Sequence, residues 1–386
     1  MSRYPLFCLL LPLVATIWVL HIVCPDWFPA TPPAACPAAM ALRQRMVDRY
    51  REAGLSGPEL GTVAALTLGD KSELDPTTRL AFRDAGAMHL LAVSGLHTGI
   101  FLSIVWALLT CFGRRRPLYD QTLRRWLLAG VTIVVLCGYA VLTGMSPSVV
   151  RSVIMASLGL IGYACHRPLL SINALAGAAL LILVVRPQDL FSVSFQLSFA
   201  AVTALVLLVP VLSSLVRLPH TWPYGVRRVM RYGLDLVWVS LAAQIGTIPF
   251  TLYYFGSFST YFLLTNIVVV PAAFVIMVLG LATLALGTVP WVGVALGWML
   301  SRVTWLLNTY VTWVEHLPCA TVSLPLSAPM ACCLVLAMGC GWLAIRPVRL
   351  SVVHGKAAWH QLFWLCPCAI LLALFVVLYL WCESAK

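Results

Sequence analysis

The chain has 386 residues, of which 61% are hydrophobic and only 10% are charged. About a quarter of the residues in soluble globular domains are charged, so this composition excludes a soluble protein and indicates one embedded in a membrane. The net charge of +12 arises largely in short loops between apolar segments, which is a topology signal and also suits a polyanionic substrate. The sequence contains no HExxH, CxxC or GxxxxGK[ST] motif, so we expect no metal site, no cofactor and no ATP hydrolysis by this chain.

The first apolar segment runs from Leu6 to Val23. About 20 apolar residues span a bilayer as a helix, so this segment is long enough to be an anchor. It resembles a signal peptide, but its length favours retention as an N-terminal membrane anchor, residues 1–24. Cys24 and Cys36 then flank a Pro-rich stretch, where a disulfide is possible on the outer face of the membrane.

Residues 25–86 form the one substantial polar segment, which we expect on the outer (periplasmic) face. Apolar residues recur there at helical spacing among arginines, at Leu42, Met46, Val47 and Tyr50. This pattern predicts an amphipathic helix lying on the membrane surface. A second apolar patch, Val63 to Leu68, is too short to span.

Residues 87–386 form the multi-span region. Its apolar segments lie at about 88–112, 126–143, 147–165, 169–185, 190–216, 234–254, 261–287, 291–316, 328–345 and 361–382. The fold class is therefore an all-α polytopic membrane protein with about ten or eleven transmembrane helices, some broken or kinked. Loops rich in basic residues alternate along the chain with loops poor in charge. The positive-inside rule assigns the basic loops to the cytoplasm, and this alternation places the N-terminus there too.

The first segment of this region carries polar groups that a bilayer disfavours, His89, Ser94 and His97. Ser94 and His97 share a helix face, as a hydrolytic pair or a ligand site would, but the segment offers no acidic partner, so we expect no catalytic residue. Gly95 and Gly99 form a pair of small residues that lets helices approach closely, as do Gly293 and Gly297.

Two later segments begin with polar residues. Ser146, Pro147 and Ser148 read as a helix start, and Arg151 follows one turn later. This arginine either extends to the interface or contacts phosphate. Four polar residues open the next candidate span, at Ser192, Ser194, Gln196 and Ser198. Interhelical hydrogen bonds explain one or two of them, whereas four in succession favour a water-filled cavity.

The following two segments combine polar residues with proline: Gln244 with Pro249, and Asn266 with Pro271. Proline breaks the helical hydrogen-bond ladder, and broken helices at membrane depth are tolerated where they line a cavity. Aromatic residues gather between the two prolines, at Tyr253, Tyr254, Phe255, Phe258, Tyr261 and Phe262. They form either an interfacial aromatic belt or a stacking surface for nucleobases.

Four blocks in this order resemble the ComEC-type competence proteins: HLLAVSGLHTGIF, GMSPSVVRSVIM, RPQDLFSVSFQLSFAAV and AAQIGTIPFTLYYFGSFSTYFLLTNIVVVP. The stretch ALTLGDKSELDPTTRLAFRDAG resembles the family's lead-in. The resemblance implies a channel in the cell inner membrane that passes single-stranded DNA into the cytoplasm during natural transformation. It also implies an outer-face DNA-receptor protein and a cytoplasmic helicase, ATPase or single-stranded-DNA-binding protein as partners, with the lipid bilayer as surroundings.

The candidate residues of the DNA path are His89, Ser94, Gly95, His97, Ser148, Arg151, Gln196, Ser198, Gln244, Pro249, Tyr254, Phe255, Asn266 and Pro271. Arg79 and Arg83 are candidates for attracting DNA at the outer face, through electrostatic attraction that depends on salt. The driving force is expected from a partner ATPase or the membrane potential.

The chain also departs from the family pattern. Full-length relatives commonly carry an outer oligonucleotide-binding-type domain and a C-terminal metallo-β-lactamase-like domain, and this sequence suggests the channel domain nearly alone, without nuclease activity and not an enzyme. Ser192 stands where an acidic residue is expected, with Asp189 nearby as a substitute. Two other readings remain, a transporter of small molecules or lipid precursors and, less favoured, an intramembrane hydrolase built on Ser94 and His97.

Overall fold

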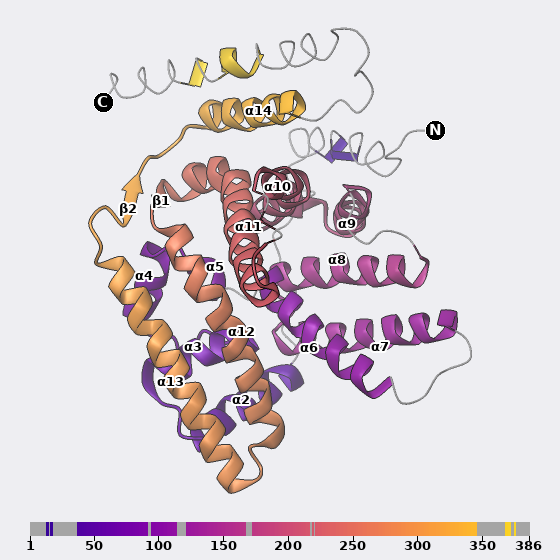
Figure 1. The fold of residues 1–386 in the computed structure, drawn as a ribbon, viewed down its shortest axis with the longest axis vertical. Coiled ribbons are helices and arrows are strands. Elements are labelled where there is room, and N and C mark those ends of the chain that lie inside the picture. Colours follow the sequence, from indigo (N-terminus) through magenta and orange to yellow (C-terminus); the bar gives the residue numbers. More distant parts are fainter. Residues whose placement is uncertain are drawn as a thin grey trace.

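The computed structural model describes residues 13–14, 16–17, 37–91, 94–113, 121–166, 172–216, 218–219, 221–345, 367–371 and 374–375. Most of the expected anchor at 6–23, both Cys24 and Cys36, and most of the last expected span lie outside these residues. Within the described ranges the fold is helical, apart from one short two-stranded ribbon (Figure 1).

The helices follow the apolar segments of the sequence. In chain order they are α2 (Pro37–Glu52), α3 (Gly57–Leu68), α4 (Pro76–Asp84), α5 (Met88–Leu91), α6 (Gly95–Gly113), α7 (Gln121–Leu142), α8 (Pro147–Ala164), α9 (Ile172–Val185), the 3-10 helix η2 (Pro187–Phe191), α10 (Val193–Leu215), α11 (Tyr224–Phe255), α12 (Phe262–Leu286), α13 (Pro290–Glu315) and α14 (Ala328–Ile345). The strands β1 (Ser257–Ser259) and β2 (Thr321–Ser323) pair antiparallel.

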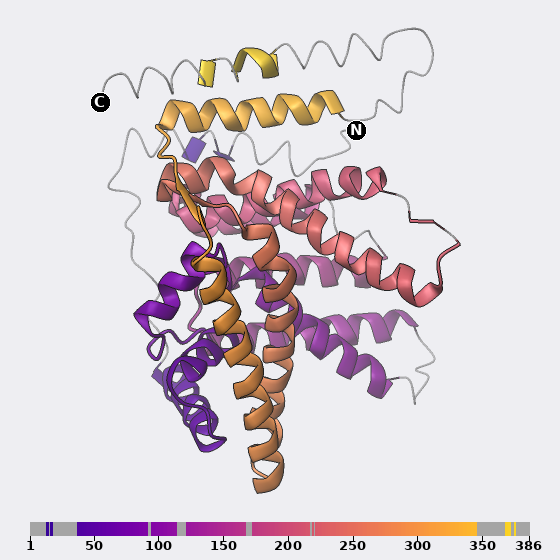
Figure 2. The same ribbon diagram turned by 60° about the vertical axis from the view of Figure 1, so that its left-hand side comes forward.

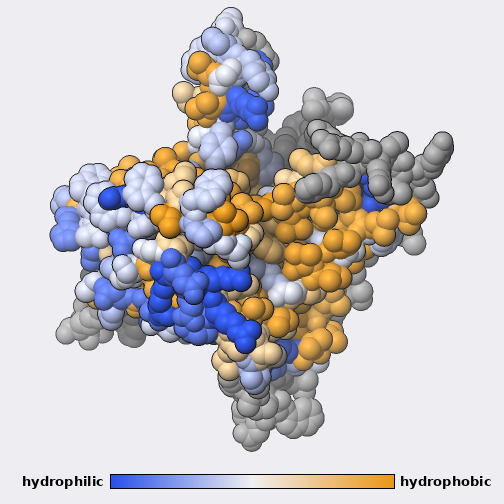
Figure 3. Space-filling view, turned by 90° about the horizontal axis from the view of Figure 1, so that it is seen from below, coloured by the Kyte–Doolittle hydropathy of each residue, from blue (hydrophilic) through white to orange (hydrophobic). Residues whose placement is uncertain are grey.

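Five of the described helices, α7, α8, α10, α11 and α12, are long and apolar enough to cross a membrane. Shorter apolar helices occur in α6, α9 and α14. Large apolar side chains point outward from several of them: Val134 on α7 is 71% exposed, and Val185 on α9 is 78% exposed. Seen from below, a broad apolar surface lies on the side of α6 and α7, next to a hydrophilic patch (Figure 3). The protein is therefore an all-α membrane protein, as the sequence predicts.

The polar segment shares a core with the helices at the other end of the chain. Helices α2 to α5 pack against α12 and α13, beside which they lie in both ribbon views (Figures 1 and 2). The predicted amphipathic helix is present as α2, but its residues Val47 and Tyr50 are buried within the protein. The Tyr50 hydroxyl donates to Oγ1 of Thr67 on α3 at 3.1 Å. The patch too short to span is α3, which is buried from Leu60 onward.

Glycine permits the closest approach between this segment and α13. A Cβ on Gly297 would lie 1.9 Å from the carbonyl oxygen of Ala53, so only glycine fits there. The pair in α6 behaves differently: a Cβ on Gly95 would lie 3.3 Å from Oγ of Ser152 on α8, whereas one on Gly99 would meet nothing within 4 Å. Close packing therefore accounts for Gly297 and, more loosely, for Gly95.

The expected helix breaks at Pro249 and Pro271 do not occur, because α11 and α12 continue through both prolines. A proline forfeits one hydrogen bond of the ladder, and packing against neighbouring helices retains the helix around it. Helix α11, which contains Pro249, nevertheless changes direction toward its C-terminal end (Figure 1). The α12–α13 hairpin runs at a steep angle to α7, α8 and α14 in both ribbon views.

Candidate functional site

A buried arginine lies where α8 meets α10. Arg151 is 1% exposed, and its Nη2 donates to the carbonyl oxygen of Ser194 at 2.8 Å, to Oγ of Ser194 at 2.6 Å and to Oγ of Ser198 at 3.1 Å. The sequence offered an interfacial position for this arginine as one alternative. The structure instead places it inside the protein, because the polar face of α10 supplies acceptors that lipid would not.

The rest of the guanidinium is not satisfied by the described part of the chain. Nε and Nη1 of Arg151 are buried and have no hydrogen-bond partner there. The nearby acidic residue is Asp189 on η2, which is 9% exposed and whose closest ion pair is with Arg186 at 4.0 Å. A buried cation without a contacting anion is costly, which marks this as an unusual site.

A second set of hydrogen bonds joins α10 to η2 and α11. Nε2 of Gln196 donates to the carbonyl oxygen of Leu190 at 3.1 Å, and the Tyr254 hydroxyl donates to Oε1 of Gln196 at 2.8 Å. Four of the predicted residues, from three motifs, therefore make hydrogen bonds around the first two turns of α10: Arg151, Gln196, Ser198 and Tyr254. Gln196 is two positions from Ser194 and from Ser198, so its bond to Tyr254 lies on a different face of α10 from the bonds of Arg151. We call these four residues, with Ser194 and Asp189, the α10 polar cluster.

Ser194 was not among the predicted site residues, although it receives the shortest bond from Arg151. Ser194 could have been predicted from its position four residues before Ser198, since residues at that spacing share a helix face. Ser192, expected to be acidic, is the N-cap of α10: its Oγ accepts from the backbone N–H of Phe195 at 3.2 Å. Asp189 is the acidic residue at this place in the fold.

Ser94 and His97 lie together at the start of α6. Nδ1 of His97 accepts the backbone N–H of Ser94 at 3.1 Å and lies 3.2 Å from its Oγ. A side chain at the third helical position that accepts the N-cap N–H is one half of a capping box. This geometry accounts for His97 as a helix-capping residue. Its Nε2 is buried without a partner among the described residues.

The other predicted path residues take no part in the hydrogen bonds that hold the α10 polar cluster. Their positions vary: His89 on α5 is exposed, Ser148 and Gln244 are half-buried, Pro249 is buried, and Asn266 and Pro271 are half-buried on α12. Oδ1 of Asn266 is buried without a partner within the described ranges.

Aromatic side chains surround the C-terminal end of α11. The rings of Tyr253 and Tyr254 meet edge to face with centroids 4.8 Å apart. Tyr253 is 42% exposed and Phe255 is 61% exposed. These rings present an accessible aromatic surface next to the α10 polar cluster, which suits either the interfacial belt or the stacking surface.

The polar segment before the multi-span region, expected on the outer face, carries balanced charge. Between residues 37 and 91 there are seven basic side chains (Arg43, Arg45, Arg49, Arg51, Lys71, Arg79 and Arg83) and seven acidic ones (Asp48, Glu52, Glu59, Asp70, Glu73, Asp75 and Asp84).

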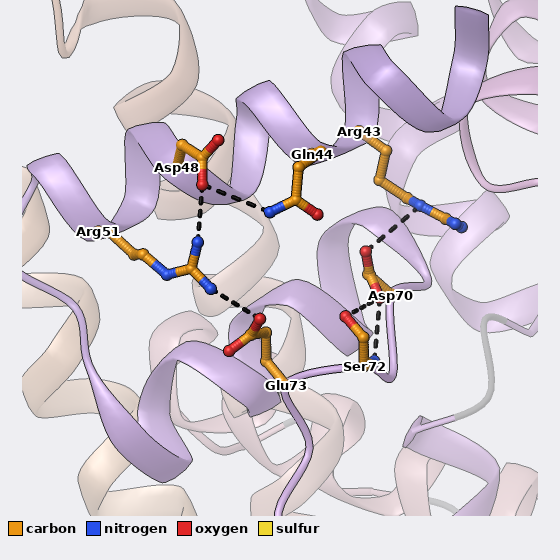
Figure 4. Close-up of polar contacts among 7 residues, drawn as sticks. All are labelled: Arg43, Gln44, Asp48, Arg51, Asp70, Ser72 and Glu73. Carbon is orange, nitrogen blue, oxygen red and sulfur yellow. Dashed lines mark hydrogen bonds and ion pairs between the residues drawn. The ribbon is translucent and has the colours of Figure 1, made fainter. Parts of the chain in front are cut away.

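Several of these charges are paired with each other (Figure 4). Arg51 lies 2.7 Å from Asp48 and 2.6 Å from Glu73, and Nε of Arg43 lies 3.4 Å from Asp70. Arg83, one of the two basic candidates, pairs with Asp84 at 2.7 Å, while Arg79 is exposed. The segment therefore holds no excess of positive charge.

Asp70 is the most enclosed acid of this segment. Burial raises its pKa, but the backbone and hydroxyl bonds from Ser72 and the charge of Arg43 outweigh burial, so the pKa is lowered overall. The Ser72 bonds measure 3.0 Å from the backbone nitrogen and 2.7 Å from Oγ. This carboxylate fixes the turn between α3 and α4.

Comparison with known proteins places the chain in a family. The sequence profile of a family described as "Competence protein" matches residues 66–350. The chain is 30% identical over 232 residues to "ComE operon protein 3" of Bacillus subtilis (strain 168), which is 60% of this chain and 27% of that protein. It is 35% identical over 174 residues to "Competence protein ComA" of Neisseria gonorrhoeae, 42% of this chain and 24% of that protein.

The matched parts thus make up about a quarter of each of these curated relatives. No solved structure matches the chain. The four sequence blocks, at about residues 85–275, lie inside the range that the family profile matches.

Proposed function

The chain belongs to the competence protein family, and from this we propose that it is an inner-membrane channel that passes single-stranded DNA into the cytoplasm during natural transformation. One of the two curated relatives is itself named a competence protein. The family match covers α4 to α14, which include the α10 polar cluster.

One observation carries the proposal, the incompletely bonded guanidinium of Arg151 among membrane-spanning helices. Arginine binds phosphate through charge-assisted hydrogen bonds, and ionisable groups buried in membrane proteins commonly mark the path of a substrate. Ser194 and Ser198 supply neutral polar groups beside it, and Tyr254 with Phe255, at the C-terminal end of α11, supplies aromatic faces that accept any base. Together these groups fit a polyanion with stackable bases.

We further propose that another protein captures the DNA, and that the energy for transport comes from a partner protein or from the membrane potential. The balanced charge of residues 37–91 favours a separate outer-face DNA receptor, since this segment offers little net attraction to phosphate. The chain has no phosphate-binding loop motif, so a cytoplasmic helicase or ATPase, or the membrane potential, drives transport. The N-terminus lies in the cytoplasm under the positive-inside rule.

We propose that the chain is not itself an enzyme. The capping geometry of Ser94 and His97 supports a structural role for both residues, and within the described part of the chain neither side chain contacts a carboxylate. A transporter of small anions would use the same buried cation. The DNA-uptake experiment described next distinguishes such a transporter from a DNA channel.

The test is deletion of the gene in a transformable host, followed by exposure to fluorescent DNA. We expect the DNA to bind at the cell surface and to be absent from the cytosol, and a plasmid copy of the gene to restore its entry. Normal entry of labelled DNA into the cytosol of the deletion strain would refute the channel. A matched strain that lacks the outer-face receptor should instead lose surface binding.

A further inference from the structure

The contact between α8 and α10 uses only part of the hydrogen-bonding capacity of Arg151. A guanidinium has five N–H donors, and here one nitrogen, Nη2, makes all the bonds. All three acceptors are neutral: one carbonyl and the hydroxyls of Ser194 and Ser198. Neutral acceptors hold a cation less strongly than anionic ones do, so this contact is weak for a buried arginine.

No anion in the described part of the chain completes the site. Nε and Nη1 are buried without a partner, and no described carboxylate lies within ion-pair distance of the guanidinium. Asp189 is close enough for its charge to act on Arg151, yet its closest ion pair is with Arg186 at 4.0 Å. Because partly satisfied polar groups are costly in a low dielectric, a ligand with several anionic oxygens would bind this guanidinium better than α10 does.

A phosphodiester has this chemistry, since it carries one charge on two non-bridging oxygens. We propose that the bonds from Arg151 to Ser194 and Ser198 form a latch between α8 and α10, which a phosphodiester of the incoming strand opens by displacing the two hydroxyls. The inference rests on the proposed function, because it takes single-stranded DNA as the ligand. It assigns Ser194 and Ser198 the opposite effect from Arg151: the serines oppose strand binding and the arginine favours it.

The opposite effects of the serines and the arginine on DNA binding distinguish the latch from a contact that only holds α8 and α10 together, which we call a clamp. In a clamp, removing either side weakens the same helix contact, so both changes lower stability and binding together. In a latch, the double change Ser194→Ala and Ser198→Ala removes the competing hydroxyls and frees the guanidinium. Alanine keeps α10 helical, so the substitution changes the acceptors and little else.

The experiment measures binding of a fluorescein-labelled oligothymidylate to the full chain in lipid nanodiscs by fluorescence anisotropy across a salt series. We expect the double serine variant to bind several-fold more tightly than the wild type and Arg151→Gln to bind several-fold more weakly. The salt slope of Arg151→Gln should fall by about 0.7, which corresponds to one lost phosphate contact. Arg45→Gln, which removes an exposed arginine on α2, is the matched control and should change neither quantity.

An oligonucleotide with a neutral methylphosphonate backbone identifies the chemical group. The gain shown by the double serine variant should vanish with this probe, and a gain that persists would overturn the phosphate latch. Weaker binding by the double serine variant, or binding equal to that of the wild type, would also overturn it and leave the channel standing. This measurement does not depend on whether Arg151→Gln folds. A wild type that binds no oligothymidylate would refute the channel and the latch together.

Discussion

The hydroxyl of Tyr254 on α11 donates to Oε1 of Gln196 on α10 at 2.8 Å, two residues before Ser198, which accepts a bond from Arg151 on α8. Three helices from three separate sequence motifs are thus joined through the first two turns of α10. Helix α10 is thus held by α8 on one face and by α11 on another.

The Tyr254–Gln196 bond should be measurable as a coupling energy. Tyr254→Phe should lower the free energy of unfolding by about 1 kcal/mol, the usual net value of such a bond, and Gln196→Leu by about 2 kcal/mol, because it also removes the bond to the carbonyl oxygen of Leu190. The double variant should lose less than the sum of the two single variants, because each single change already breaks the bond. Thermal unfolding in detergent micelles checks this, and strict additivity would show that the bond contributes nothing.

Gly297 should tolerate no side chain. A Cβ there would lie 1.9 Å from the Ala53 carbonyl oxygen, so Gly297→Ala should force α13 away from the segment after α2. We expect a loss of at least about 3 kcal/mol, at the upper end of overpacking costs, and poor yield of monodisperse protein. Gly99→Ala is the control, since nothing lies within 4 Å of its added methyl group, and it should change stability by no more than about 1 kcal/mol. Equal behaviour of the two variants in size-exclusion chromatography would contradict the close approach.

Lowering the pH should destabilise the polar segment, residues 37–91, through protonation of Asp70. Its folded pKa is lowered, so its contribution to stability is present above the unfolded value of about 3.9 and is lost as pH falls through the folded pKa. The wild type should therefore lose stability below about pH 4, while Asp70→Asn should be less stable at neutral pH and show a weaker dependence in that window. Melting temperatures between neutral and acidic pH test this. A wild type and an Asn variant with parallel pH profiles would exclude Asp70 as the source.

His97 should be replaceable by glutamine. Glutamine at the third helical position is the usual partner in a capping box, so His97→Gln should keep the acceptor for the Ser94 N–H and retain near-normal stability and transformation frequency. His97→Leu removes that acceptor and should cost about 1 kcal/mol. If His97→Gln is as defective in transformation as His97→Leu while remaining folded, the imidazole has a chemical role that capping does not explain.

Helix positions could be predicted well from the sequence because long apolar runs need only composition to be recognised. The start of α8 at Pro147 followed from the preference of proline for the first helical turn, although Ser146 makes no side-chain capping hydrogen bond. The burial of α3 could not be predicted in this way. Its short apolar run is covered by α12 and α13, which lie far later in the sequence, from Phe262 onward.

The sequence allowed the polar candidate residues to be picked out, but the contacts that each of them makes could not be predicted from it. Arg151 was singled out, but its acceptors are 43 and 47 residues away, so no local pattern specified burial against α10. The arginines of the outer segment suggested an attractive surface for DNA. Arg51 instead pairs with Glu73, 22 residues away, and only the folded arrangement reveals that pairing.

The two-stranded ribbon has a mechanical consequence. Ser257 pairs with Ser323, and the backbone N–H of Leu324 donates to the carbonyl oxygen of Gly256 at 2.8 Å. Tyr254 is only two residues before Gly256, and α14 begins shortly after Leu324. Leu252 on α11 also packs against Met330 on α14. A displacement of the α11 terminus would therefore be transmitted to α14 through both the ribbon and this apolar contact.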